Sequence, residues 1–255
     1  MKKTITRTVF ATLALLFSLT FSSYAQTYYN LYLCDNTTVK LRPSEPNLAN
    51  NDKVYWFRKA PGEATASAVG TAITYNGLGS ADLTLPANMG AGLYEYFSAV
   101  ETAGGCLGPQ SDAFTIYKLP TKTLALSANR TTYCGDNSGP NSGSVVTATT
   151  TPAATLPAGI EYAYEWSVTL AGTPPTTATP GTADNSITTV SEYTMTTTTA
   201  GSYVFDATVK YVKSSANTGT FLSASNEGCE VAATATQTVT VTPRPAKPTI
   251  SFSSN

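Results

Sequence analysis

Residues 91–100 read "AGLYEYFSAV", and residues 200–209 read "AGSYVFDATV". Both stretches begin with Ala-Gly-x-Tyr and continue with alternating residue types, the pattern of a β-strand that buries one face. They lie 109 residues apart in a chain of 255 residues. The recurrence indicates that one structural unit is present twice.

A lone tryptophan precedes each of these stretches at nearly the same distance. Trp56 lies 38 residues before Tyr94, and Trp166 lies 37 residues before Tyr203. The segments whose lengths differ are rich in Gly, Ser, Asn and Pro, the composition of loops. The constant spacing therefore predicts two copies of one domain, with these four aromatic residues in the domain cores.

The rest of the chain also favours β-structure. Segments such as "TTVKL", "ADLTL", "FTIY" and "YTMT" alternate apolar or β-branched residues with polar ones, and no segment has the period of an amphipathic helix. Short strands separated by turn signals at intervals of about 8–12 residues are typical of a β-sandwich. The predicted fold class is all-β, with two sandwiches in tandem.

Two proline-spaced linkers, "KLPTKT" and "TPRPAKPT", mark where each unit ends. After the second linker, "ISFSS" parallels the "LALSA" that follows the first. The predicted organisation is a signal peptide, a first domain, a second domain, and a linker with the start of a third repeat, which occupy residues 1–25, 26–119, 120–243 and 244–255.

The N-terminus has the features of a secretory signal peptide. A basic start is followed by the apolar run 9–19, and Ser23 and Ala25 are the small residues that a cleavage site requires. An uncleaved anchor is the alternative, but the apolar run is short for a membrane span. We expect cleavage near Ala25 and a secreted or cell-surface location. No later segment of the mature chain resembles a transmembrane helix.

The mature chain is mildly acidic. The whole sequence has 15 Lys and Arg residues, of which three lie in the signal peptide, so 12 remain against 16 Asp and Glu. The resulting net charge of −4 is scattered along the chain rather than clustered. This charge argues against nucleic acid or an anionic membrane as the partner.

No catalytic residue, cofactor site or metal site is predicted. The chain contains no histidine, which excludes Ser-His-Asp and Cys-His catalysis within it. Glu161 and Glu165 are the close carboxylate pair in a strand-like stretch, and we interpret them as solvated strand residues. Residues 47–52 and 135–143 gather oxygen ligands of the kind that calcium prefers, but the same residue types form ordinary turns. The sequence therefore predicts a protein that is not an enzyme.

The Trp and Gly-x-Tyr arrangement resembles the immunoglobulin-like fold, in which a core Trp lies on strand C and a Tyr opens strand F. In antibody-type domains a cysteine follows that Tyr by two residues; here Tyr96 and Phe205 stand in its place, and we expect their rings to fill the space. The order of motifs resembles the Ig-like repeats of large secreted adhesins from gliding bacteria. This resemblance implies adhesion, display or spacing at the cell surface, with an unknown protein or glycan as partner.

Two alternatives remain open at this stage. The units could be accessory modules of a secreted enzyme whose catalytic domain lies outside this sequence. They could instead bind carbohydrate, with Tyr28, Tyr29 and Tyr32 as a stacking face, although core positions explain these tyrosines as well.

Four cysteines in an exported chain favour disulfides, and they permit three pairings. Each unit carries one cysteine ahead of strand B (Cys34, Cys134) and one at the start of strand G (Cys106, Cys229). On that basis we predict the pairs Cys34–Cys106 and Cys134–Cys229. In a simple Ig topology these two positions lie at opposite ends, so the pairing requires either an interrupted first strand or a strand register that differs from the expected one by several residues.

Overall fold

A computed structural model describes residues 28–34, 38–44, 48–136, 142–153, 155–172, 174–222 and 228–251. Every regular element in these residues is a β-strand, and the strands form sandwiches in tandem. The predicted all-β fold is confirmed. The predicted signal peptide lies outside the described residues. Within the described ranges, no helix has the length and apolarity needed to span a lipid bilayer.

Domain 1 comprises strands β1 to β8 and has one large and one small sheet. In the large sheet the strands follow the order β1, β8, β7, β3 and β4, and β5 also pairs with β3. The small sheet contains only β2 and β6. The bounds are β1 Leu31–Leu33, β2 Lys40–Leu41, β3 Lys53–Lys59, β4 Ser67–Ala68, β5 Ile73–Thr74, β6 Leu83–Thr84, β7 Gly92–Glu101 and β8 Phe114–Lys118.

Domain 2 comprises strands β9 to β19 and has two well-developed sheets. One sheet follows the order β10, β19, β16, β12 and β13, with β18 paired to β16, and the other follows β14, β15, β11 and β9. The bounds are β9 Thr123–Ala128, β10 Thr132–Cys134, β11 Ser144–Thr151, β12 Ile160–Leu170, β13 Thr176–Thr177, β14 Gly181–Ala183, β15 Val190–Met195, β16 Gly201–Lys213, β17 Thr220–Leu222, β18 Val231–Ala232 and β19 Gln237–Thr242.

The repeated decapeptide is the central strand of each domain. It forms β7 in domain 1 and β16 in domain 2, and each pairs antiparallel with the strand that carries the tryptophan, β3 or β12. Burial alternates strictly along β16 and β11, because successive side chains of a strand point to opposite faces. The alternation in the sequence therefore identified the core faces of these strands.

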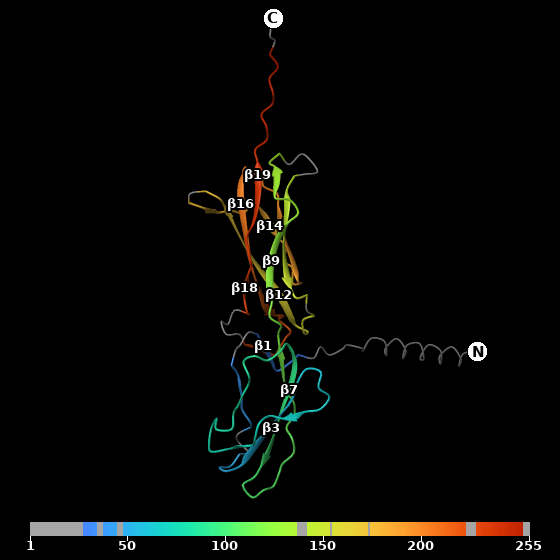
Figure 1. The fold of residues 1–255 in the computed structure, drawn as a ribbon, viewed down its shortest axis with the longest axis vertical. Helices are drawn as coiled ribbons and strands as arrows, with labels where there is room; N and C mark the ends of the chain where they lie inside the picture. The colour runs from blue at the N-terminus through green and yellow to red at the C-terminus, as the bar shows by residue number, and fades with distance from the viewer. Residues whose placement is uncertain are drawn as a thin grey trace, which may run out of the picture.

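The two domains are stacked end to end (Figure 1). The last strand of domain 1, β8, leads through residues 119–122 directly into β9 of domain 2. Residues 243–251 leave domain 2 at the end opposite domain 1 and contain no strand (Figure 1). The described part of the chain is thus an elongated pair of sandwiches with the joint near its middle.

Candidate functional site: the joint between the domains

Strand β1 is shared by the two domains. It pairs in parallel with β8 of domain 1 on one side and with β17 of domain 2 on the other. The amide of Thr220 donates to the carbonyl of Asn30 (2.9 Å), and the amide of Cys34 donates to the carbonyl of Leu222 (3.3 Å). The large sheet of domain 1 therefore continues into a segment of domain 2.

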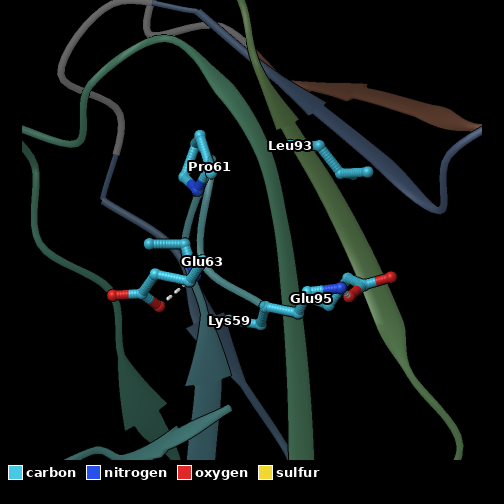
Figure 2. Close-up of a pocket in the computed structure, with 7 residues that line it drawn as sticks. Lys59, Pro61, Glu63, Leu93 and Glu95 are labelled. Carbon is cyan, nitrogen blue, oxygen red and sulfur yellow. Dashed lines mark hydrogen bonds and ion pairs between the residues drawn. The ribbon is translucent and has the colours of Figure 1, made fainter. Parts of the chain in front are cut away.

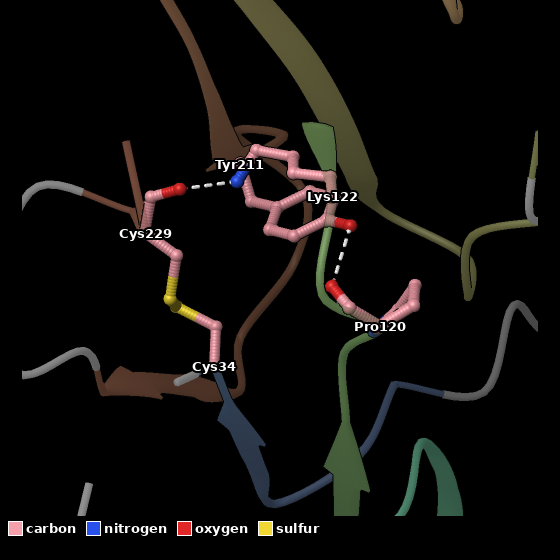
Figure 3. Close-up of a disulfide and its surroundings, with 5 residues drawn as sticks. All are labelled: Cys34, Pro120, Lys122, Tyr211 and Cys229. Atoms are coloured by element: carbon pink, nitrogen blue, oxygen red, sulfur yellow. Dashed lines mark hydrogen bonds between the residues drawn. A yellow bond between two sulfur atoms is a disulfide. The ribbon is translucent and has the colours of Figure 1, made fainter. Parts of the chain in front are cut away.

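A disulfide joins the same two segments. Cys34, which follows β1, is bonded to Cys229, with 6.0 Å between the Cα atoms. Both cysteines are buried, and Figure 3 shows the bond crossing between the two domains. The bond closes a sequence separation of 195 residues, so it constrains the domains relative to each other rather than a loop within one of them.

The predicted pairings Cys34–Cys106 and Cys134–Cys229 are therefore wrong. Because β1 runs parallel to β8, Cys34 lies at the end of β8 that faces domain 2, whereas Cys106 precedes the start of β8. A five-residue strand separates the two by roughly 17 Å, far beyond disulfide reach. Cys106 and Cys134 are free thiols, the first exposed and the second half-buried.

A buried lysine in the linker supports the disulfide. The Lys122 ammonium donates to the carbonyl of Cys229 and lies 4.0 Å from the centroid of the Tyr211 ring. The Tyr211 hydroxyl in turn donates to the carbonyl of Pro120 (3.0 Å). Since an uncompensated buried ammonium is costly, these contacts hold the linker on the surface of domain 2 (Figure 3).

Of the three tyrosines considered as a sugar-stacking face, Tyr32 belongs to the apolar core of the joint. Tyr32 is fully buried, and its hydroxyl lies 3.4 Å from the carbonyl of Ala158 in domain 2. The ring of Tyr29 stacks on Tyr117 at 5.3 Å. Tyr32 belongs to the same buried cluster as Tyr162 and Tyr211 of domain 2. Tyr32 is therefore a core residue of the joint, whereas Tyr28 and Tyr29 are only partly buried.

Glycine at position 219 permits this close approach. A Cβ atom there would lie 2.2 Å from the carbonyl oxygen of Tyr29 and 2.7 Å from the Tyr32 ring. Asn217 positions the same turn, since its side chain accepts from the amide of Gly219 and donates to the carbonyl of Gly159. The β17 segment thus fits against β1 only with a small residue ahead of the strand.

The four residues predicted as core lie on neighbouring strands of one sheet in each domain. In domain 1 these are β3 and β7, and in domain 2 they are β12 and β16. Trp56, Tyr94 and Tyr203 are 6%, 7% and 3% exposed, whereas Trp166 is half-buried. The Trp56 indole donates to the carbonyl of Ala81 (3.1 Å).

Both tyrosines hydrogen-bond backward over four residues. The Tyr94 hydroxyl donates to the carbonyl of Gly90 and the Tyr203 hydroxyl to that of Thr199, each at 3.1 Å. This tyrosine corner is a hallmark of Ig sandwiches. The residues that replace the antibody-type cysteine, Tyr96 and Phe205, are almost fully buried, which confirms that aromatic rings fill that space.

A buried carboxylate organises the loops at the far end of domain 1. The Asp52 side chain accepts hydrogen bonds from the amides of Ala49 (2.8 Å) and Ala103 (3.0 Å). Its backbone carbonyl accepts from the amide of Tyr75 (2.7 Å). Asp52 is 4% exposed. One residue therefore ties three loops together. Of the second oxygen-rich stretch, 135–143, residues 137–141 lie outside the described part of the chain.

These loops carry large apolar side chains on their surface. Leu78 and Leu107 are 75% and 66% exposed. They lie on the segments that Asp52 ties together, Leu78 shortly after Tyr75 and Leu107 shortly after Ala103. Recognition residues often lie on loops that a rigid scaffold positions, so this loop cluster is the candidate contact surface.

A surface pocket in domain 1 has a volume of about 270 Å³ and lies beside the turn after β3. Figure 2 shows its lining residues. The charges there are already paired: the Lys59 ammonium lies 3.0 Å from the Glu95 carboxylate, and the Glu63 carboxylate accepts from the amide of Ala60 at 2.6 Å. Because these charged groups already have partners within the protein, the pocket gives no indication of a ligand.

The remaining acidic candidates also have structural partners. Glu165 is exposed and forms an ion pair with Lys210 on the neighbouring strand. This agrees with its interpretation as a solvated strand residue. Glu161 lies on the same strand, β12, opposite Val212. Across the described ranges, no cluster of acidic or cysteine side chains has the geometry of a metal site.

No protein-family model and no curated protein matches the chain. Solved structures that resemble it are the fibronectin(III)-like modules of Clostridium thermocellum CbhA (10% identity, 90% of this chain and 98% of that one, TM-score 0.33) and the FN1-FN3 domains of chicken CNTN1 (12%, 84% and 63%, TM-score 0.36). A third is invasin, a bacterial integrin-binding protein (16%, 82% and 36%, TM-score 0.31). At these scores the similarity assigns no function.

Proposed function

We propose that this chain is an exported, non-enzymatic surface protein in which domain 2 is a stiff stalk that displays domain 1. The observation that carries the proposal is the joint. A strand shared between the domains, a buried interdomain disulfide and a buried linker lysine hold the two sandwiches in one orientation. Such a joint suits adhesion, display or spacing, because these functions require that a binding surface is held in a fixed position and do not require a chemical reaction.

The linker supports the same function. Leu119 and Lys122 are buried, and the amide of Leu119 donates to the carbonyl of Leu33 (2.7 Å). Flexible linkers between domains are exposed and make few contacts. Because this linker is packed on both sides, the loop cluster around Asp52 is held at a fixed distance from the C-terminal end of domain 2.

The composition fits this role as well. A chain without histidine has no Ser-His-Asp or Cys-His group, and the charges in the pocket beside β3 are paired. The expected partner is a protein or glycan at a cell surface. The loops of domain 1 would contact it through apolar side chains such as Leu78 and Leu107.

The test is adhesion by beads that carry residues 26–255 attached through the C-terminus. They are offered surfaces coated with extracellular-matrix glycoproteins or mucin. We expect retention above that of uncoated beads, and loss of most of it in Leu78→Ser/Leu107→Ser. The matched control is Ile187→Ser, which removes a 53% exposed apolar residue from domain 2 and is expected to leave retention unchanged. Equal loss in both variants would refute display by domain 1.

A further inference from the structure

Strand β10 of domain 2 is the counterpart of β1 of domain 1. Each is three residues long and pairs in parallel with the last strand of its own domain, β8 or β19. Leu33 and Tyr133 point into the cores of their own domains. The next residue in each case is a cysteine, Cys34 or Cys134. The two strands thus occupy the same place and orientation in the two sandwiches.

The two counterparts differ in what covers their outer edge. In domain 1, β17 pairs with β1, and Cys34 is bonded to Cys229. In domain 2, β10 is the edge strand of its sheet, and within the described ranges no strand pairs with its outer side. Cys134 is a free, half-buried thiol.

The backbone of β10 offers hydrogen bonds to a further strand. Thr131 accepts from the amide of Thr240 (2.8 Å), and the amide of Gly135 donates to Thr242 (3.0 Å). Residues that alternate along a parallel strand direct their backbone groups to opposite sides. The backbone groups of Thr132 and Cys134 therefore face away from β19, as those of Cys34 face β17.

We propose that the outer edge of β10, together with Cys134, is a docking site for another β-sandwich that resembles domain 2. That unit would add a short parallel strand to β10, as β17 is added to β1, and its cysteine would bond to Cys134. This inference goes beyond display by domain 1, because it assigns an interaction to the opposite end of the molecule.

The chain itself favours this occupant. The segment Pro245-Ala246-Lys247 after β19 repeats Pro120-Thr121-Lys122 after β8, and Lys122 is the residue that contacts the carbonyl of Cys229. Counted from the residues that pair with Leu33 and Tyr133, Lys118 and Val241, the second Pro-x-Lys segment lies two residues farther along the chain, so a sandwich attached through it would be held near β10 by a slightly longer connection than the one between the domains.

A second copy of this chain fits less well. Its free Cys106 is exposed, but the connection between β7 and β8, residues 102–113, is fully described and contains no strand that could pair with β10. The other free thiol of a second copy, Cys134, lies on β10 itself, and two copies of one edge strand related by a two-fold axis would pair antiparallel, unlike the parallel pairing of β1 with β17.

The covalent step is a two-electron oxidation of two thiols. Cys134 and the partner cysteine lose two protons and two electrons and form one S–S bond, while a disulfide-carrying oxidoreductase is reduced to its dithiol. The side chains around β10 are less apolar than at the existing joint, since Thr132 and Thr240 stand where Tyr32 and Tyr117 do in domain 1. Binding at β10 therefore depends on backbone pairing and the disulfide more than on apolar packing.

The test uses the full mature chain with Cys106→Ser, so that Cys134 is the remaining free thiol. The probe is the synthetic peptide "TGTFLSASNEGCE" (residues 218–230), whose cysteine is activated as a mixed disulfide with thionitrobenzoate. Attack by the Cys134 thiolate forms the peptide–protein disulfide and releases coloured thionitrobenzoate. Because strand pairing raises the effective concentration of the two sulfurs, we expect this peptide to react at least about tenfold faster than a scrambled peptide.

The matched control is the Cys134→Ser variant, in which Cys106 is expected to react equally fast with both peptides. Hydrogen exchange on the wild-type chain with a cysteine-free form of the peptide gives an independent readout, with added protection expected in 132–135. Equal rates for native and scrambled peptides at Cys134, or no added protection, would overturn the proposal. Cys134–Cys134 dimers or Cys106–Cys134 ladders that form from the wild-type chain alone would assign the edge to a second copy and also overturn it.

Discussion

Domains 1 and 2 share a central frame but differ in the sheet that closes it. In both, the strand that carries the tryptophan pairs with the Gly-x-Tyr strand, and the tyrosine corner is the same. The second sheet of domain 1 has two strands of two residues each, whereas that of domain 2 has four strands. Domain 1 instead extends its large sheet with β17. Domain 1 therefore takes part of its support from domain 2.

The largest effect is expected from the tryptophans. Trp56→Ala removes a ring that is 6% exposed from the smaller sandwich, and we expect a loss of about 3–5 kcal/mol in the free energy of unfolding of domain 1. Trp166→Ala should cost less, because that ring is half-buried. Urea denaturation followed by domain-specific hydrogen exchange measures both. An equal or larger cost for Trp166→Ala would break the comparison.

The next effect concerns the disulfide. Cys34→Ser/Cys229→Ser is expected to cost about 2–4 kcal/mol and to divide one cooperative unfolding transition into two, with domain 1 unfolding first. The matched control, Cys106→Ser/Cys134→Ser, removes the free thiols and is expected to change the midpoint little. Calorimetry distinguishes the two variants. A single transition in the first variant would show that domain 1 does not need the bond.

The tyrosine corners should behave alike in the two domains. Tyr94→Phe and Tyr203→Phe each remove one hydroxyl that donates to a backbone carbonyl, and each is expected to cost about 1 kcal/mol. Denaturant unfolding of the two variants gives the values. A cost in one domain only would mean that the corner is structural in that domain alone.

The smallest effect is a loss of stability at alkaline pH. Burial raises the pKa of Tyr96 in domain 1 and of Tyr133 in domain 2 to about 12. The unfolded chain loses these protons near the ordinary pKa of 10.0, so the stabilisation is complete below pH 10 and is lost as the pH rises toward 12. The loss of stability should therefore begin near pH 10 and continue to about pH 12. Denaturation of Tyr96→Phe and Tyr133→Phe across this range should show a shallower decline than the wild type.

The frame could be predicted from the sequence because its signals are local. Alternation along a strand and the distance from Trp56 to Tyr94 do not depend on what lies beyond the domain. The contacts at the joint, in contrast, depend on the neighbouring domain. Strand β17 is three residues within the connection from β16 to β19, and its partner β1 is nearly 190 residues earlier, so no spacing in the sequence links them. The cysteine pairing failed for the same reason: Cys34 and Cys229 are brought together by domain stacking, whereas the prediction considered each domain alone.

The tyrosines at the start of the chain show the same limit. Tyr29 and Tyr32 suit a stacking face or a core equally well by residue type. Only the structure shows that Tyr32 is buried with Tyr162 of domain 2, whereas Tyr29 stacks on Tyr117 of its own domain.

The central claim is that the joint makes the two domains one rigid body, and nitrogen-15 relaxation of backbone amides tests it most directly. For the oxidised chain, we expect a single anisotropic rotational diffusion tensor to fit the amides of β7 and β16 together. Residues 243–251 should show faster internal motion. Separate tensors for the two domains, with domain 1 tumbling faster, would contradict the claim.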